Sequence, residues 1–152
     1  MQVRTLRTIV YLASGIGILL SLFAAAELFD AALSQICSFG GYVSCSAVAN
    51  SGRTTFAFLP DWLWGLGGFV AIIAVNALGE QRPHDERYSY ALLVLTTAGI
   101  AVALYFLYVE VGVIGALCLV CATAYGMGFI AWGASIGLAR RARSDAEFTD
   151  AD

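Results

Sequence analysis

Four apolar stretches, each long enough to cross a lipid bilayer, constrain this chain more than any other feature. They cover residues 8–26, 62–79, 88–109 and 113–139. About 20 mainly apolar residues suffice to span roughly 30 Å of hydrocarbon. The composition agrees, because 60% of the 152 residues are hydrophobic and only 12% are charged, and a soluble domain of this size cannot bury so much apolar surface. The sequence therefore predicts an all-α integral membrane protein, a four-transmembrane-helix bundle that forms one domain over residues 1–143.

The connections between these stretches differ greatly in length. The first, residues 27–61, is long and rich in Ser and Gly, and connections of that length are usually functional or disordered. The later two connections are short. After the last stretch, residues 144–152 form an acidic tail, which we expect to be disordered.

The basic residues indicate how the chain is oriented. All eight are Arg, and seven of them flank the first stretch, the second connection or the end of the last stretch: Arg4, Arg7, Arg82, Arg87, Arg140, Arg141 and Arg143. Cytoplasmic segments collect positive charge, so we expect a multi-pass protein of the cell membrane with both termini in the cytoplasm. The long first connection then forms an extracytoplasmic loop. With a net charge of −3, the chain has no basic field for nucleic acid.

The N-terminus also resembles a secretory signal. Arg4 and Arg7 precede an apolar run that ends in Ala24-Ala25-Ala26, a pattern typical of a cleavage site after small residues. The run is long for a signal peptide, so we expect it to be retained as the first membrane helix.

A few polar residues lie within or beside the apolar stretches. Asn76 lies deep in the second stretch and is expected to hydrogen-bond within the bundle. Glu27, Asp30 and Glu110 stand near the ends of stretches, and we interpret them as solvated flanking residues rather than as proton carriers.

The four cysteines are the most informative residues for function. Cys37 and Cys45 lie in the first connection, and Cys118 and Cys121 form a CxxC motif near the start of the last stretch. All four are expected at the extracytoplasmic face, where disulfides persist. A CxxC bridge closes too small a loop to add much stability, whereas a helix N-terminus stabilises a thiolate. The pattern favours redox-active cysteines over purely structural disulfides. It does not favour zinc, which typically needs two closely spaced pairs, so we predict no metal.

The position of Tyr125 points toward a lipid-soluble substrate. Cys118, Cys121 and Tyr125 share one helix face, and the phenol lies about 6 Å deeper than Cys121. It is placed either to donate a hydrogen bond to a carbonyl compound or to serve as an ordinary interfacial aromatic. The sequence has no nucleotide or flavin fingerprint and no iron–sulfur set. We therefore expect a membrane quinone to accept the two electrons that the dithiol loses when it is oxidised. This predicts a thiol:quinone oxidoreductase. The alternative is a non-catalytic tetraspan scaffold with structural disulfides.

The cysteine pattern resembles the vitamin K epoxide reductase family. The resemblance rests on Cys37-x7-Cys45, on Ser51 six residues later, and on Cys118-Leu-Val-Cys121-Ala-Thr-Ala-Tyr125, all on a frame of four spans. DsbB-type oxidases carry their CxxC first and the separated pair last, which is the reverse order. The resemblance covers nearly the whole chain, and it implies a membrane enzyme that oxidises thiols, reduces a quinone and supports disulfide bond formation.

The resemblance also implies a role for each cysteine. Cys37 and Cys45 match the loop pair that exchanges electrons with a thioredoxin-like or DsbA-like dithiol protein. We expect this partner to be a separate chain, because little sequence follows the last stretch. Cys118 and Cys121 match the active-site pair, with Cys121 nearest the quinone. In the implied cycle, Cys45 attacks Cys118 and so releases Cys121 as a thiolate.

Three further residues match the quinone pocket of the family. Tyr125 matches the tyrosine that faces the quinone, and Ser51 matches a Ser or Thr on a short helix above the active site. Asp61 stands four residues before Gly65, where the vertebrate enzyme has Asn, and this departure changes the available hydrogen bonds. The implied cofactor is a quinone such as menaquinone or ubiquinone.

Overall fold

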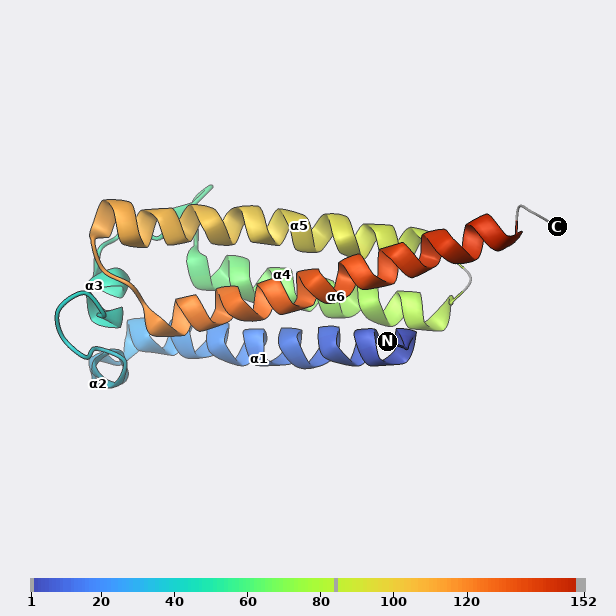
Figure 1. The fold of residues 1–152 in the computed structure, drawn as a ribbon. Coiled ribbons are helices and arrows are strands. Elements are labelled where there is room, and N and C mark those ends of the chain that lie inside the picture. The colour runs from blue at the N-terminus through green and yellow to red at the C-terminus, as the bar shows by residue number, and fades with distance from the viewer. Residues whose placement is uncertain (1, 84, 150–152) are drawn as a thin grey trace.

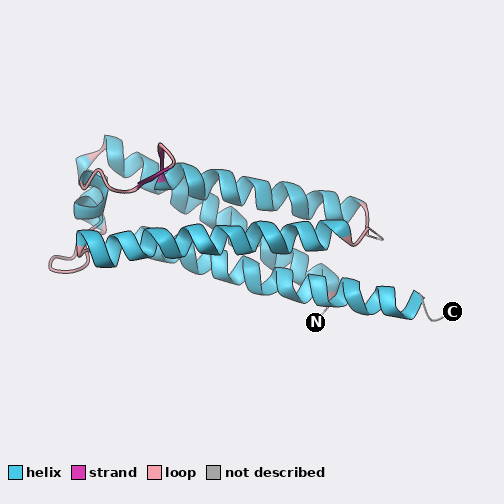
Figure 2. Ribbon diagram, turned by 90° about the horizontal axis from the view of Figure 1, so that it is seen from above, coloured by secondary structure: helices cyan, strands magenta, loops and turns pink. Residues whose placement is uncertain are grey.

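The computed structural model describes residues 2–83 and 85–149. Within these ranges, four helices are long and apolar enough to cross a membrane: α1 (Val3–Phe29), α4 (Asp61–Gln81), α5 (Arg87–Tyr108) and α6 (Leu119–Thr149). They lie side by side as an elongated bundle (Figures 1 and 2). The short elements are α2 (Ala31–Ile36), α3 (Cys45–Asn50), strands β1 (Thr55–Phe56) and β2 (Leu59–Pro60), and the π-helix η1 (Val109–Ile114). The helical membrane-protein class predicted from the sequence is confirmed.

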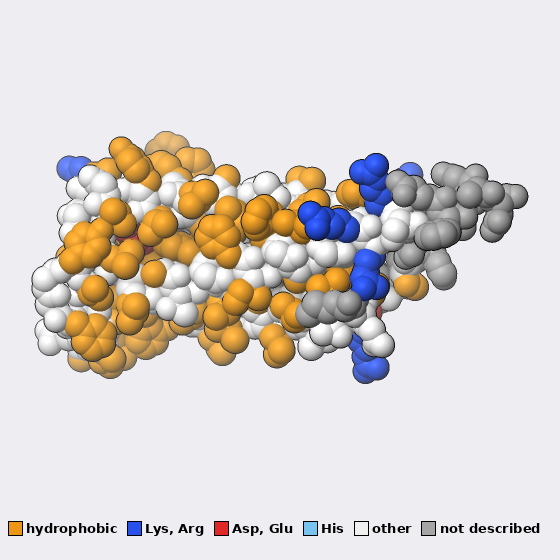
Figure 3. Space-filling view, viewed as in Figure 1, with side chains coloured by type: hydrophobic (Ala, Val, Ile, Leu, Met, Phe, Trp, Pro, Cys, Tyr) orange, Lys and Arg blue, Asp and Glu red, His pale blue; other side chains and the backbone are white. Residues whose placement is uncertain are grey.

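The outer surface of the bundle is largely apolar (Figure 3). Leu12, Leu19 and Val94 on this surface are 62%, 67% and 69% exposed. The 21 residues of α4 extend about 31 Å at a rise of about 1.5 Å per residue, which matches the hydrocarbon thickness of a bilayer. These side chains are therefore suited to contact lipid, and the polar backbone groups are satisfied inside each helix.

Helix α1 packs against both α4 and α6, and α5 packs against the same two helices. Their shared core contains Leu6, Val10, Phe69, Ile72, Leu92, Ala134 and Leu138. At Gly17 a β-carbon would overlap the ring of Phe69, so α1 and α4 approach each other closely only because this position lacks a side chain. Small residues commonly allow such close packing of membrane helices.

Arg7 and Asn76 join α1 to α4 at the end of the bundle that carries the chain termini. The Arg7 guanidinium donates to the Asn76 carbonyl oxygen (3.0 Å), to Asn76 Oδ1 (3.3 Å) and to the Gly79 carbonyl oxygen (2.9 Å). Asn76 Nδ2 donates back to the Arg7 carbonyl oxygen at 3.2 Å. The predicted role of Asn76, a hydrogen bond within the bundle, is confirmed.

We expect Asn76→Leu to lower the free energy of unfolding by about 1–3 kcal/mol, because it removes the two hydrogen bonds that the Asn76 side chain makes with Arg7 inside the bundle. Thermal unfolding in detergent measures the change. Thr123→Val is the matched control, since the Thr123 hydroxyl donates only to the Leu119 carbonyl of its own helix, at 2.8 Å. Equal melting temperatures for the two variants would contradict this role of Asn76.

The segment between α1 and α4 is more ordered than a loop. Asp30 Oδ1 accepts a hydrogen bond from the Ala32 amide at 2.9 Å, and Ser44 Oγ accepts one from the Ala47 amide at 3.2 Å. These side chains cap the N-termini of α2 and α3. Residues 30–60 thus fold as short helices and a two-residue hairpin against one end of the bundle (Figure 1).

Backbone hydrogen bonds tie this segment to the residues that precede the CxxC motif. The Leu117 amide donates to the Tyr42 carbonyl oxygen at 2.9 Å, and the Ser44 amide donates to the Leu117 carbonyl oxygen at 3.1 Å. Val43 and Leu117 form a parallel β-bridge. As a consequence, the two cysteine-bearing segments are held together although 73 positions separate Cys45 from Cys118.

The beginning and the end of the last helix differ from the sequence prediction. The predicted stretch starts at 113, but η1 extends α5 to Ile114, and α6 begins only at Leu119. Gly115 ends η1 with a φ of 74°. This is the left-handed conformation that glycine adopts without strain at the end of a helix. The expectation of a disordered tail is wrong over 144–149, which continue α6. The last three residues, 150–152, lie outside the described residues.

Candidate active site at two cysteine pairs

The first cysteine pair is a disulfide between the two short helices. Cys37 follows the last residue of α2, and Cys45 is the first residue of α3. Their Cα atoms are 5.7 Å apart and their sulfur atoms are bonded, within the range expected for a disulfide. Cys37 is 5% exposed and Cys45 is 1% exposed. Both residues are buried, and Cys37 is the slightly more exposed of the two.

The second pair consists of thiols at the N-terminus of α6. Cys118 directly precedes this helix and so occupies its N-cap position, and its carbonyl oxygen accepts the Ala122 amide at 2.9 Å. The Cys121 amide donates to Cys118 Sγ at 3.3 Å. This is the bond that a capping side chain makes with the first turn.

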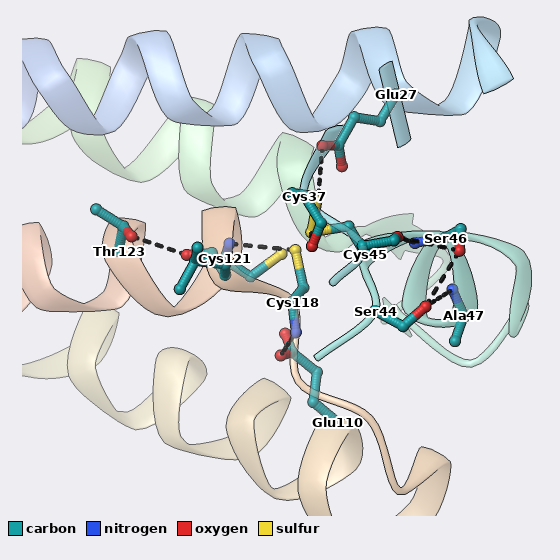
Figure 4. The surroundings of a disulfide bond; sticks show 12 residues. Glu27, Cys37, Ser44, Cys45, Ser46, Ala47, Glu110, Cys118, Cys121 and Thr123 are labelled. Carbon is teal, nitrogen blue, oxygen red and sulfur yellow. Dashed lines mark hydrogen bonds between the residues drawn. A yellow bond between two sulfur atoms is a disulfide. The ribbon is translucent and has the colours of Figure 1, made fainter. Parts of the chain in front are cut away.

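The two pairs lie next to each other (Figure 4). Cys37, Cys45, Cys118 and Cys121 belong to one buried cluster with Val48 and Ala116. A small cavity is bordered by Cys45 together with Cys118 and Cys121. The structure thus brings together the four cysteines that the sequence singles out, with the loop pair oxidised and the CxxC pair reduced.

Glu27 on α1 lies beside the loop disulfide. Its Oε1 is 3.1 Å from Cys37 Sγ, and the side chain is only 5% exposed. A disulfide sulfur carries no proton, so this contact becomes a hydrogen bond only when Cys37 is released as a thiol. Glu27, Cys37 and Cys45 also cluster tightly enough for a metal ion, but the disulfide occupies both sulfur atoms in this state.

Asp61, the first residue of α4, lies beside the CxxC pair. Its Oδ2 is 3.9 Å from Cys121 Sγ, and its Oδ1 accepts the Trp62 amide at 2.7 Å. The Asp61 amide in turn donates to the Thr54 carbonyl oxygen at 2.9 Å. Asp61 is thus fixed at the helix start with one oxygen directed to the sulfur of Cys121.

Tyr125 and Glu110 are joined by a short hydrogen bond. The Tyr125 hydroxyl donates to Glu110 Oε1 at 2.7 Å, and the Cys118 amide donates to Glu110 Oε2 at 3.1 Å. Glu110 lies in η1 and is fully buried. One carboxylate therefore connects the predicted quinone ligand Tyr125 to the CxxC motif.

The interpretation of Glu27 and Glu110 as solvated flanking residues is wrong, whereas Asp30 is exposed as expected. Both glutamates interrupt apolar sequence beside a cysteine motif, and a carboxylate in that setting usually has a functional partner. This signal was present in the sequence, but their partners, Cys37 and Tyr125, are ten and fifteen positions away.

A second, larger cavity opens beside Cys121. It has a volume of about 210 Å³, somewhat below the range of about 300–1,000 Å³ that is typical of ligand sites. Asp61, Cys121 and Tyr125 contribute its titratable groups, and Ser21 and Thr96 add two hydroxyls. The rest of its wall is mainly apolar and comes from α1, α4, α5 and α6, and includes Trp62, Trp64, Phe69, Ile100 and Phe106. Such a wall suits a flat, lipid-soluble ring compound.

Ser51 differs from the other predicted site residues. Its hydroxyl donates to the Val48 carbonyl oxygen at 2.7 Å and accepts the Arg53 amide at 3.2 Å. It closes the C-terminus of α3 and is not part of the wall of the larger cavity. A direct contact of Ser51 with a quinone stays a prediction.

Comparison with known protein families agrees with this arrangement. The vitamin K epoxide reductase family matches residues 8–136 of the chain. The matched region contains all four cysteines and the residues Glu27, Asp61, Glu110 and Tyr125. This chain belongs to the vitamin K epoxide reductase family.

Proposed function

We propose that this protein is a thiol:quinone oxidoreductase that passes electrons from a thioredoxin-like protein through two cysteine pairs to a membrane quinone. Family membership implies a membrane thiol oxidoreductase. The observation that carries the finer proposal is the position of Cys121, which borders both the cavity shared with Cys45 and Cys118 and the larger apolar cavity. Cys121 therefore connects the sulfur relay to a space open to lipid-soluble molecules.

The relay begins at the loop disulfide. A thiolate of the reduced partner attacks Cys37 and forms a mixed disulfide, and Cys45 leaves as a thiolate. Cys45 then attacks Cys118 of an oxidised CxxC pair, which breaks the Cys118–Cys121 bond and releases Cys121 as a thiolate. The second thiol of the partner displaces Cys37, and Cys37 attacks Cys45 to restore the loop disulfide. The partner has then lost two electrons, and Cys118 and Cys121 have gained them.

The state with an oxidised loop pair and a reduced CxxC pair, which this structure holds, is the state that follows this transfer. When bound, a quinone supplies an acceptor for two electrons and two protons. Asp61, Cys121 and Tyr125 would hold its polar ring in the larger cavity, and the apolar wall would exclude water. Oxidation of Cys118 and Cys121 to a disulfide releases the electrons and protons required.

The charge distribution supports an orientation for the reaction. Arginine side chains gather at the end of the bundle that carries the termini (Figure 3), and that end is proposed to be cytoplasmic. The cysteine pairs lie at the opposite end (Figures 1 and 4), which would face the oxidising side of the membrane. A separate dithiol protein on that side would be the electron donor.

The proposal is tested with the purified protein in lipid nanodiscs. We expect it to oxidise a reduced thioredoxin-like protein only when menaquinone or ubiquinone is added, and thiol blocking during turnover should trap a Cys45–Cys118 disulfide, identified by peptide mapping. A protein that keeps only the Cys37–Cys45 bond and oxidises no dithiol would instead be a scaffold with a structural disulfide.

A further inference from the structure

Glu110 is a carboxylic acid buried inside a membrane protein. It is 0% exposed and lies in a π-helix, a form of helix found frequently at functional sites. Burial of an ionised carboxylate is costly unless hydrogen bonds compensate. The amides of Gly115 and Ala116 both donate to the Glu110 carbonyl oxygen and so fix the backbone at this residue. The side chain is directed toward α6.

The two oxygens of the carboxylate serve two different parts of the site. Oε1 accepts the Tyr125 hydroxyl at 2.7 Å, and Oε2 accepts the Cys118 amide at 3.1 Å. Cys121 and Asp61 also lie within electrostatic reach of Glu110. These four residues are the titratable and charged groups that face it from α4 and α6.

The protonation state of Glu110 determines where the hydroxyl proton of Tyr125 points. A phenol has a single proton. While Glu110 is ionised, Tyr125 donates this proton to Oε1 and has none for a ligand in the cavity. Once Glu110 is protonated, it can donate to the Tyr125 oxygen, and the phenol proton is free to turn toward the cavity that Tyr125 lines.

We propose that Glu110 is the positioning residue and proton relay between the CxxC thiols and Tyr125, an inference that rests on the proposed quinone reduction. Formation of the Cys118–Cys121 disulfide releases two electrons and two protons. One thiol proton passes to Glu110, whose carboxylate lies within hydrogen-bonding reach of the Cys121 side chain, and Glu110 hands it to Tyr125 as Tyr125 gives its own hydroxyl proton to a quinone oxygen. The other passes to Asp61, whose Oδ2 is 3.9 Å from Cys121 Sγ and which lines the same cavity, and from there to the second quinone oxygen. Both carboxylates and the phenol return to their starting states.

Glu110→Gln separates the relay from a merely structural role. The amide oxygen of Gln can accept the Cys118 amide, and its NH₂ group can donate to the Tyr125 oxygen, so the geometry of protonated Glu110 is kept while the transferable proton is lost. We expect the KM for quinone to change less than about threefold and kcat to fall about 100-fold, the scale of a lost proton transfer. The part of the pH dependence of kcat that arises from protonation of Glu110 should disappear in Glu110→Gln. Glu110→Asp should recover part of kcat.

The chain offers a matched control in Glu80, whose Oε2 accepts the Tyr11 hydroxyl at 3.0 Å at an exposed site far from the cysteines. Glu80→Gln replaces the carboxylate of this second tyrosine–glutamate pair by an amide in the same way, and it should leave kcat unchanged. The relay is overturned if Glu110→Gln keeps the kcat and pH profile of the wild type, or if it raises KM and lowers the melting temperature as we expect of Glu110→Ala. Wild-type protein that fails to couple dithiol oxidation to menaquinone refutes the proposed function itself, and the relay with it.

Discussion

Cys121→Ala is expected to abolish quinone-dependent oxidation of a protein dithiol, with a loss of at least about 1,000-fold, as for removal of a nucleophile that no neighbour replaces. Among the four cysteines, Cys121 is the one that lines the larger cavity. Without it, no cysteine sulfur lines the larger cavity, and Cys118 cannot give up electrons to a quinone by forming the Cys118–Cys121 disulfide. The decrease in quinone absorbance on reduction measures the rate directly.

Thr123→Ala is the control for this experiment, because Thr123 lies on the same helical turn and its hydroxyl bonds only to the Leu119 carbonyl. Its rate should stay within about twofold of the wild type. The Cys121→Ala protein should also retain the Cys37–Cys45 disulfide and an unchanged melting temperature. Activity that survives in Cys121→Ala but disappears in Cys118→Ala would make Cys118 the terminal sulfur and would reverse the proposed order.

Replacement of both Cys37 and Cys45 by Ser should separate the oxidation of a protein dithiol from the oxidation of the small molecule dithiothreitol. We expect oxidation of a thioredoxin-like protein to fall at least about 100-fold, because the variant lacks the loop disulfide that accepts the partner's electrons in the proposed relay. Dithiothreitol is small enough to approach Cys121 through the larger cavity, so its oxidation should persist at about one third of the wild-type rate or more. Both rates are measured with the same quinone.

Ser46→Ala tests whether the loop itself, rather than its sulfur atoms, is responsible. Ser46 follows Cys45 in α3 and hydrogen-bonds to Ser38 and Ser44, so its loss perturbs the loop without touching the relay. Both activities should remain in this variant. Equal loss of the protein-driven and the dithiothreitol-driven reactions in the double Ser variant would show that the loop disulfide shapes the active site rather than carries electrons.

The long helices were predictable from sequence because a bilayer requires every spanning segment to satisfy its own backbone and to present apolar side chains. That requirement is local, so hydropathy and length identify α1, α4 and α5 closely. The start of α6 was not predictable in this way. Residues 113–118 are as apolar as the helix that follows, and only the left-handed Gly115 and the β-bridge from Val43 to Leu117 separate them from it.

The cysteines of the site were recognisable from their spacing, but the contacts of the acids around them were not. Asp61 was singled out through its family position, and the structure places it near Cys121. Glu27 and Glu110 lie at the ends of apolar stretches, where charged residues are usually solvated. Their burial depends on how α2 and η1 fold back toward the bundle, and on partners in other elements. Sequence periodicity carries no information about such contacts.

The backbone bonds between Leu117 and the segment around Tyr42 and Ser44 have a consequence for the environment in which the protein works. Membranes differ in thickness by several ångströms, and helices adapt by changing their tilt. Because both redox couples are fastened to one small backbone unit rather than to opposite helices, their separation does not follow the tilt. The rate of exchange between sulfurs should therefore be insensitive to acyl-chain length, while the movement of quinone into the bundle remains free to vary with it.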